Sequence, residues 1–192
     1  MGHSMGDMPD EAEDDSRIPS RPIALVGLMG AGKTTVGRRL ANTLNLPFVD
    51  ADEEIEASAG RSVSDIFADF GEDAFRDGER KVIARLLDDA PKIVALGGGA
   101  FATDATRDIV KQKAITIWIK ADLDTLMERV SRRETRPLLQ TEDPRAVMHT
   151  LMTTREAAYE QADIHVDGAD GPHHTTVDKI LAALIHQGFI AP

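Results

Sequence analysis

Residues 27–34 read GLMGAGKT and match the pattern GxxxxGK[ST]. They follow an apolar run, PIALV at 22–26, and precede a stretch whose pattern predicts a helix. Glycines let backbone N–H groups line a concavity, and the helix directs its positive end into it. Lys33 can then reach the β and γ phosphates, and the Thr34 hydroxyl can ligate the bridging magnesium ion. We therefore predict a phosphate-binding loop, because the strand–loop–helix context disfavours a chance match in a glycine turn. Its predicted nucleotide contacts are Gly30, Ala31, Gly32, Lys33, Thr34 and Thr35.

The length and composition predict one domain. The chain has 192 residues, of which 42% are hydrophobic, which suits one well-buried core but is short for two. No run approaches the ~20 apolar residues of a membrane span, and the N-terminus lacks a signal-peptide pattern. The absence of cysteine excludes disulfides and thiolate chemistry, and is compatible with a reducing compartment. We expect a soluble, cytoplasmic protein.

Charge is unevenly distributed along the chain. The net charge is −11, and residues 1–20 hold six acidic side chains against one arginine, without apolar periodicity. We expect residues 1–20 to form a disordered acidic tail and residues 21–192 to form the domain. The domain is itself acidic, which argues against general nucleic-acid binding.

Strand and helix patterns alternate after the phosphate loop. Short runs with β-branched residues predict strands at 23–26, 47–49, 93–96, 115–119 and 164–166. Helical patterns occur at about 33–45, 52–59, 63–89, 104–112, 122–133, 144–161 and 174–187. Asp143 with Pro144 predicts one helix start, and Thr103 is expected to cap another. The alternation predicts an α/β fold with a parallel sheet, helices on both faces, and ligands at the carboxyl ends of the strands.

Two carboxylates follow the second predicted strand. In FVDADEEIE, Asp50 and Asp52 lie just past its carboxyl end and point in different directions. Asp50 suits a carboxylate that holds the water ligands of a metal ion, and Asp52 suits one that accepts a substrate hydroxyl proton. The alternative is that both, with Glu53 and Glu54, only cap and acidify a helix N-terminus.

Three consecutive glycines follow the third predicted strand. Gly97, Gly98 and Gly99 allow backbone N–H groups to approach a ligand that a side chain would block. The alternative is a flexible turn without a ligand.

A basic run begins on a predicted helix and ends in a loop. It contains Arg129, Arg132, Arg133 and Arg136, and the helix cannot continue comfortably into Pro137. A mobile cover that carries cations over a triphosphate would need this arrangement. A solvated basic helix face is the alternative, which only the phosphate loop disfavours.

Other polar and aromatic residues give weaker signals. Arg76 and Arg155 are single arginines on predicted helices, and on pattern alone each suits a surface ion pair. Trp118 and Tyr159 have apolar neighbours and are expected to pack in the core. The six histidines show no metal-ligand spacing and receive no role.

Five segments together resemble the shikimate kinases, in order, from about residue 21 to residue 187. They are GLMGAGKTT, DADEEIE, GRSVSDIFADFGEDAFR, ALGGGA and RPLL, at residues 27–35, 50–56, 60–76, 95–100 and 136–139. The resemblance implies a five-stranded parallel sheet flanked by helices, of the P-loop nucleoside monophosphate kinase type. It also implies a substrate-binding segment at about 51–80 and a lid at about 129–143.

The resemblance implies a reaction as well. Shikimate kinases use MgATP to phosphorylate a ring hydroxyl of shikimate, giving shikimate 3-phosphate and ADP, in aromatic amino acid biosynthesis. ATP, Mg²⁺ and a small-molecule substrate are thus expected, together with a monomeric state and no nucleic-acid or membrane partner.

Residue roles follow from the matching positions. Asp52 matches the aspartate that holds the substrate hydroxyls and is the candidate base. Arg76 and Arg155 match the pair that clamps the substrate carboxylate, and Gly97–Gly99 match the backbone wall of the pocket. Arg136 matches the lid arginine that bridges nucleotide and substrate.

The adenine contacts are open at two places. Arg129 matches the arginine that stacks on adenine, but the lid varies in length before RPLL, so Arg132 could take this role. The segment DGADGPHH, which begins at Asp167, matches no adenine loop, and its contacts are not assigned.

Three alternative functions are less favoured by the sequence. A gluconate kinase would share the fold, but the triple glycine and the GRS segment disfavour it. A regulatory module that binds nucleotide without transfer is disfavoured because Lys33, Thr34, Asp52 and Arg136 are all present. A purely structural protein is weaker still.

Overall fold

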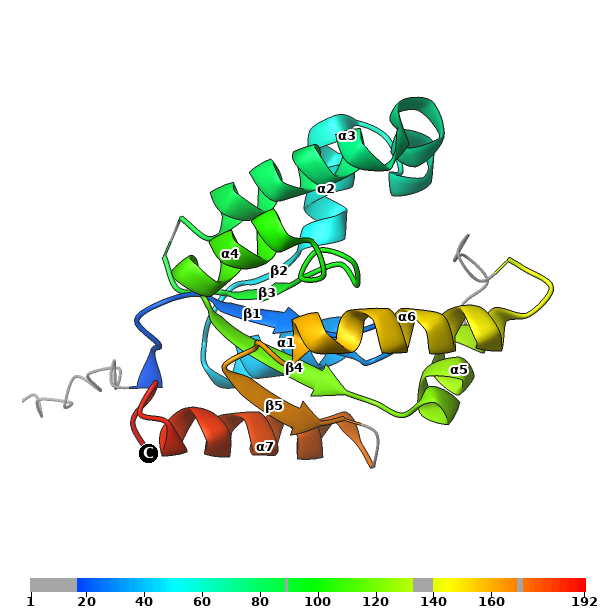
Figure 1. Cartoon of the computed structure of the whole chain (residues 1–192). Helices are drawn as coiled ribbons and strands as arrows, with labels where there is room; N and C mark the ends of the chain where they lie inside the picture. Colours follow the sequence, from blue (N-terminus) through cyan, green and yellow to red (C-terminus); the bar gives the residue numbers. More distant parts are fainter. Residues whose placement is uncertain (1–16, 89, 133–139, 169–170) are drawn as a thin grey trace, which may run out of the picture.

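A five-stranded parallel sheet forms the centre of the molecule (Figure 1). The computed structural model describes residues 17–88, 90–132, 140–168 and 171–192. The strand order is β2-β3-β1-β4-β5, and all four pairings are parallel. The strands are β1 (Ile23–Val26), β2 (Phe48–Asp50), β3 (Ile93–Ala95), β4 (Ile115–Lys120) and β5 (Ile164–Asp167). The predicted fold class is therefore confirmed.

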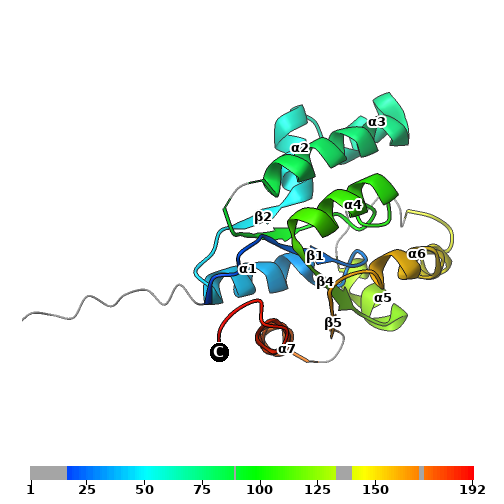
Figure 2. The ribbon, with the colours of Figure 1, turned by 60° about the vertical axis from the view of Figure 1, so that its left-hand side comes forward.

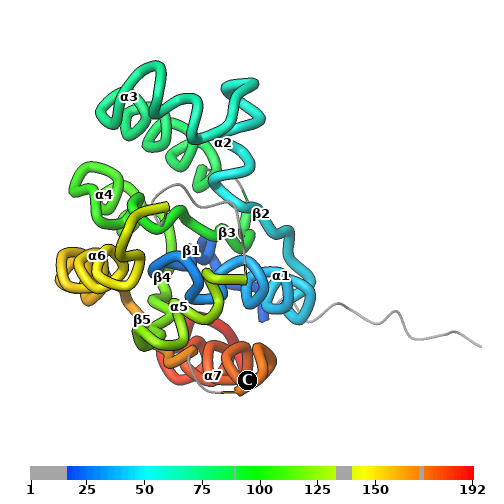
Figure 3. Tube along the Cα trace, turned by 90° about the vertical axis from the view of Figure 1, so that its right-hand side faces the viewer, coloured from blue at the N-terminus to red at the C-terminus, as the bar shows by residue number. Residues whose placement is uncertain are grey.

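Helices cover both faces of the sheet. They are α1 (Lys33–Thr43), α2 (Ala51–Ala59), α3 (Val63–Leu86), α4 (Asp104–Lys113), α5 (Leu123–Ser131), α6 (Pro144–Tyr159) and α7 (His173–His186). In Figure 3, α1 and α7 lie on one face of the sheet, and α4 and α6 lie on the other. Figure 2 shows α2 and α3 together beyond the β2 end of the sheet. The carboxyl-terminal part of α3 still packs on the main core, through Ile83 and Leu86.

The predicted elements agree with the observed ones except within one helix. Element ends differ by no more than three residues from those predicted. The prediction of an unbroken helix over 63–89 is wrong at Gly71, whose backbone adopts φ 81° and ψ 176°. Only glycine tolerates that conformation without strain, so α3 is broken there into two pieces.

The burial of the strands follows from the double covering. Every residue of β1 is buried, because its neighbours β3 and β4 are strands and helices cover both of its faces. The edge strand β5 instead alternates buried and exposed residues. A second, smaller apolar cluster joins α2 to α3 through Ile55, Ile66 and Phe75. The segment beyond β2 thus has a small core of its own.

Two predicted helix starts have different outcomes. The Asp143 carboxylate accepts a hydrogen bond from the Ala146 N–H at 3.0 Å, which confirms the predicted cap. Thr103 stands at the start of α4 but makes no side-chain cap, so that prediction is wrong. Its hydroxyl donates instead to the Gly99 carbonyl oxygen at 3.2 Å. Thr103 therefore supports the triple-glycine turn rather than the helix.

Residue 17, the first described residue, lies against the last residue of the chain. Residues 1–16 of the predicted acidic tail lie outside the described residues. Close to the tail's predicted end, Pro19 is buried and the Arg17 side chain donates to the Pro192 carbonyl oxygen at 3.4 Å.

Among the helices in the described ranges, none is long and apolar enough to cross a membrane.

Candidate active site

The phosphate-loop pattern forms a tight turn between β1 and α1. Gly27, Gly30 and Gly32 adopt φ values of 145°, 83° and 97°. A Cβ on Gly27 would lie 2.7 Å from the Ile119 carbonyl oxygen, and one on Gly30 would lie 2.9 Å from the Val130 side chain. Conformation requires glycine at all three positions, and at Gly27 and Gly30 space requires it as well. The loop therefore has a backbone that few other sequences could adopt.

Lys33 places its charge inside this loop. Its ammonium group donates to the carbonyl oxygens of Gly27 and Leu28 at 2.7 and 2.9 Å. Lys33 is also the first residue of α1, and Thr35 follows on the same turn. The ammonium group and the helix N-terminus together make the loop attractive to an anion.

Asp50 caps a helix and also contacts the phosphate loop. One carboxylate oxygen caps α2 by accepting from the N–H groups of Asp52 at 3.0 Å and Glu53 at 3.4 Å. The other accepts the Thr34 hydroxyl at 3.0 Å. A hydroxyl and a carboxylate are hard oxygen donors of the kind that Mg²⁺ takes, with water and phosphates completing its coordination. The residues present therefore fit a magnesium ion.

The triple glycine makes room for three charged side chains. A Cβ on Gly97 would lie 2.6 Å from Oδ1 of Asp52, and one on Gly98 would lie 3.3 Å from Nη1 of Arg155. A Cβ on Gly99 would overlap the Arg76 guanidinium. Because none of the three glycines has a positive φ, space and not backbone conformation requires them. The turn thus gathers the three predicted acceptor-binding side chains from α2, α3 and α6.

A buried carboxylate that the sequence analysis missed supports this group. Glu79 is 1% exposed, and its Oε1 lies 2.8 Å from Nη1 of Arg76. Burial raises the pKa of Glu79, the charge and hydrogen bond of Arg76 oppose the rise, and the Asp52 charge adds to it. Arg76 and Glu79 stand three residues apart on a helix, which is a pairing signal, but glutamate is usually assigned to the exposed face. Arg76 is consequently a half-buried, oriented cation and not a surface one.

Arg129 connects the phosphate loop to the turn after β5. It donates to the carbonyl oxygens of Gly30 at 3.2 Å, Ala31 at 3.1 Å and Gly168 at 3.0 Å. Arg132 lies elsewhere, in an exposed ion pair with Glu128 at 2.5 Å. Of the two arginines, only Arg129 thus contacts the loop.

The end of the basic run lies outside the described residues. Arg133 and Arg136 lie outside the described residues, with the rest of 133–139 in the middle of the predicted lid. The role of Arg136 remains a prediction from the sequence.

His173 lies beside the phosphate loop, although the sequence analysis assigned it no role. Its ring lies 3.4 Å from where a Cβ on Gly32 would stand, beside Arg129. Burial, followed by the charges of Arg129 and Arg39, lowers the pKa of His173. The imidazole is therefore mainly neutral at neutral pH.

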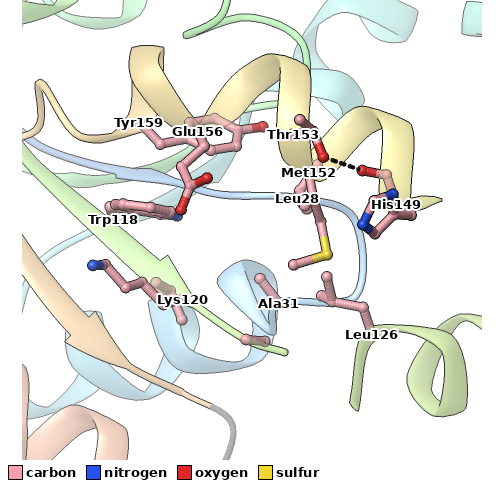
Figure 4. Close-up of a pocket in the computed structure, with 12 residues that line it drawn as sticks. Leu28, Ala31, Trp118, Lys120, Leu126, His149, Met152, Thr153, Glu156 and Tyr159 are labelled. Carbon is pink, nitrogen blue, oxygen red and sulfur yellow. Dashed lines mark hydrogen bonds between the residues drawn. The ribbon is translucent and has the colours of Figure 1, made fainter. Parts of the chain in front are cut away.

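A cavity of about 310 Å³ opens between the phosphate loop, the end of β4, α5 and α6 (Figure 4). Leu28, Leu126 and Met152 give it apolar walls, with Trp118 and Tyr159 at the other end. Tyr159 is 1% exposed and Trp118 is 9% exposed, and their ring centroids are 5.7 Å apart. The expected packing role of both aromatic residues is confirmed.

Comparison with known proteins decides the family. Residues 29–185 match the family model described as shikimate kinase. The chain belongs to the shikimate kinase family. A shikimate kinase from Caulobacter vibrioides is 53% identical over 173 residues, covering 90% of this chain and 86% of the relative. A shikimate kinase from Rhodopseudomonas palustris is 49% identical over 179 residues, covering 93% and 88%.

Solved shikimate kinase structures agree with this assignment. The shikimate kinase from Acinetobacter baumannii in complex with shikimate superimposes with a TM-score of 0.84 at 34% identity, covering 90% of this chain and 96% of that one. A gluconokinase from Sinorhizobium meliloti reaches a TM-score of 0.64 at 21% identity, which indicates a shared fold alone. The resemblance to shikimate kinases in the five sequence segments is thus confirmed, and the chain is a kinase.

Proposed function

We propose that the chain transfers the γ-phosphoryl group of ATP to a ring hydroxyl of shikimate, giving shikimate 3-phosphate and ADP in aromatic amino acid biosynthesis. One observation carries the proposal. A complete phosphate loop lies beside a carboxylate and two arginines that pack against three consecutive glycines. Membership of the shikimate kinase family supports the same reaction.

The nucleotide half of the site is the phosphate loop with its surroundings. The backbone from Gly30 to Thr35 is proposed to bind the phosphates, with Lys33 on the β and γ groups. Thr34, and Asp50 through water, would hold Mg²⁺, which supplies charge neutralisation for the phosphates when bound. Arg129 is proposed to contact the adenine, because it lies against the loop whereas Arg132 pairs with Glu128 on the surface.

The acceptor half is the group around the triple glycine. The guanidinium groups of Arg76 and Arg155 are proposed to clamp the shikimate carboxylate, since planar forks suit a carboxylate better than an ammonium group does. Asp52 is proposed to hold the ring hydroxyls, and the backbone of Gly97–Gly99 forms the wall. A small, polyhydroxylated carboxylic acid has complementary groups for each of these contacts.

The proposed chemical step is in-line transfer. The ring hydroxyl oxygen forms a bond to the γ phosphorus while the bond from that phosphorus to the ADP oxygen breaks, and Asp52 accepts the hydroxyl proton. Lys33 stabilises the charge on the transferring group, together with Arg136, whose position lies outside the described residues. Positioning of the two substrates would supply most of the rate enhancement.

We also propose that the enzyme acts as a cytoplasmic monomer, without nucleic-acid or membrane partners. The acidic charge supports the absence of a nucleic-acid partner, and the lack of cysteine is compatible with a reducing cytoplasm. Size-exclusion chromatography with light scattering would test the monomer.

The test of the function is an acceptor panel. ADP release from MgATP is measured with shikimate, with gluconate, with a nucleoside monophosphate and without an acceptor. Release that depends on shikimate alone is expected. ADP release with another acceptor would show a kinase whose substrate is not shikimate. Tight ATP binding without any ADP release would favour a regulatory module.

A further inference from the structure

Two neighbouring side chains of α6 converge on the middle glycine of the triple-glycine turn. The Arg155 guanidinium lies against Gly98, with its Nη1 3.3 Å from the position that a Cβ on Gly98 would take. One helical turn later, the Tyr159 hydroxyl donates a hydrogen bond to the Gly98 carbonyl oxygen. Residues four apart on a helix lie one above the other, so the phenol and the guanidinium are neighbours.

The phenol interacts with the guanidinium as well as with the turn. Burial raises the pKa of Tyr159, and the charge and hydrogen bonding of Arg155 oppose that rise. The hydroxyl consequently stays protonated at neutral pH and remains a donor to Gly98. Tyr159 thus lies one helical turn from Arg155 and is hydrogen-bonded to the glycine that Arg155 faces.

Packing and one hydrogen bond act together on the Tyr159 ring. Trp118 packs on it at 5.7 Å between ring centroids, but Tyr159 also borders the cavity of about 310 Å³ (Figure 4). The hydrogen bond from the hydroxyl to the Gly98 carbonyl oxygen fixes the far end of the ring. The hydroxyl therefore has a positioning effect that an isosteric phenylalanine would lack.

We propose that Tyr159 is a positioning residue for substrate recognition, which holds the Arg155 guanidinium and the Gly98 backbone in the geometry that receives the substrate carboxylate. The proposal deepens the proposed function and rests on its carboxylate clamp. Tyr159 does not itself contact the reacting atoms. It acts on one end of the acceptor, so its loss affects acceptor recognition and leaves the nucleotide half unaffected.

The test uses Tyr159→Phe with two acceptors, shikimate and its uncharged, nearly isosteric carboxamide. The wild type is expected to prefer shikimate strongly. The variant is expected to lose about tenfold in kcat/KM for shikimate, mainly through KM. Its kcat/KM for the carboxamide should fall much less, and its KM for ATP should stay unchanged. If Tyr159 had only a structural role, kcat/KM would fall equally for both acceptors.

Thr116→Val is the matched control, because it also removes one buried hydroxyl. Thr116 is fully buried and donates to Asp163 at 2.8 Å, on the strand β4. It should lower the melting temperature at least as much as Tyr159→Phe and leave the preference for shikimate over the carboxamide unchanged.

A measurement on the wild type does not depend on how the variant folds. Tyr159 is the only tyrosine in the sequence, so the tyrosine Raman doublet reports its hydrogen bonding alone. Shikimate should shift the doublet more than the carboxamide does.

The outcomes separate this inference from the function on which it rests. If Tyr159→Phe affects both acceptors equally, or if the doublet does not respond to shikimate, Tyr159 has no positioning role even though the clamp stands. If the wild type itself does not distinguish shikimate from the carboxamide, and Arg155→Lys leaves the shikimate KM unchanged, the clamp and this inference are both overturned.

Discussion

The two halves of the site are built in different ways. The nucleotide half is built around one contiguous loop, and its lysine and carbonyl contacts lie within six positions of one another. The acceptor half combines Asp52, Arg76, Arg155 and a glycine turn from four separate segments. The nucleotide half is built mainly from backbone. The acceptor half is built from charged side chains that pack against glycines, where a larger residue would leave no room.

This difference determines what each half can tolerate. Changes in the loop should impair phosphoryl transfer for any acceptor, because they alter the groups that meet the phosphates. Changes around the triple glycine should impair recognition of the acceptor and leave ATP binding intact. The two halves join at Asp50, whose two oxygens contact Thr34 on one side and cap the helix that carries Asp52 on the other.

The largest effect is expected from Lys33→Ala in the nucleotide half. Loss of the ammonium group removes a charge from the transferring phosphates, and kcat should fall by about 10³-fold or more. Steady-state kinetics measure the loss, and the melting temperature should stay close to that of the wild type. Lys81→Ala, which breaks an exposed ion pair with Asp77, is the control and should keep full activity. Near-normal turnover by the Lys33 variant would mean that the loop is not catalytic.

The acceptor half is tested by Gly99→Ala. The new methyl group would overlap the Arg76 guanidinium and displace it, so kcat/KM for shikimate should fall by about 10²-fold. The KM for ATP should be little changed. Kinetics with each substrate varied in turn provide both values, and an equal rise in both KM values would contradict the separation of the two halves.

Gly78→Ala is the matched control for this substitution. Gly78 lies in α3, and a Cβ there would meet nothing within 4 Å. Alanine favours the helix by up to about 1 kcal/mol over glycine, so this variant should melt at a slightly higher temperature and keep wild-type kinetics.

A smaller effect is expected from Glu79→Gln, which sharpens the comparison within the acceptor half. The neutral amide keeps the shape but loses the ion pair that orients Arg76, so the shikimate KM should rise by about fivefold. An unchanged KM would show that Arg76 is oriented by other contacts, such as its longer pairing with Glu72.

The same variant should change how stability depends on pH. Because burial raises the folded-state pKa of Glu79 above its unfolded value, its protonated form favours the folded state. That contribution is present below about pH 4.3 and is lost as the pH rises through the folded pKa. Glutamine cannot ionise, so the melting temperature of the variant minus that of the wild type should be larger at pH 7.5 than at pH 5. A difference that shrinks with rising pH would show that ionised Glu79 favours folding.

The sequence sufficed for the elements and for the nucleotide half because both depend on local patterns. Strand and helix positions follow from apolar periodicity, and the loop follows from glycines that need positive φ. The acceptor half depends on long-range packing, which periodicity does not report. Glu79 was therefore missed, although its spacing from Arg76 was visible. For Asp50, position alone could not show that one carboxylate both caps α2 and accepts the Thr34 hydroxyl.

The reason for the triple glycine also needed the structure. The sequence pointed to close approach of the backbone to a ligand, whereas the three-dimensional arrangement shows protein side chains against each glycine. The break in α3 at Gly71 was missed for a related reason, because a lone glycine within a helical pattern is often tolerated.

The central claim is that Asp52 links the two halves by presenting a shikimate hydroxyl to the γ phosphate. Its most direct test is ADP release from MgATP by Asp52→Asn and by the wild type, each with and without saturating shikimate. We predict that the wild type releases ADP only with shikimate, and that the variant binds ATP normally but loses about 10²-fold or more of that release. Wild-type release by the variant, or release by the wild type that is independent of shikimate, would contradict the account.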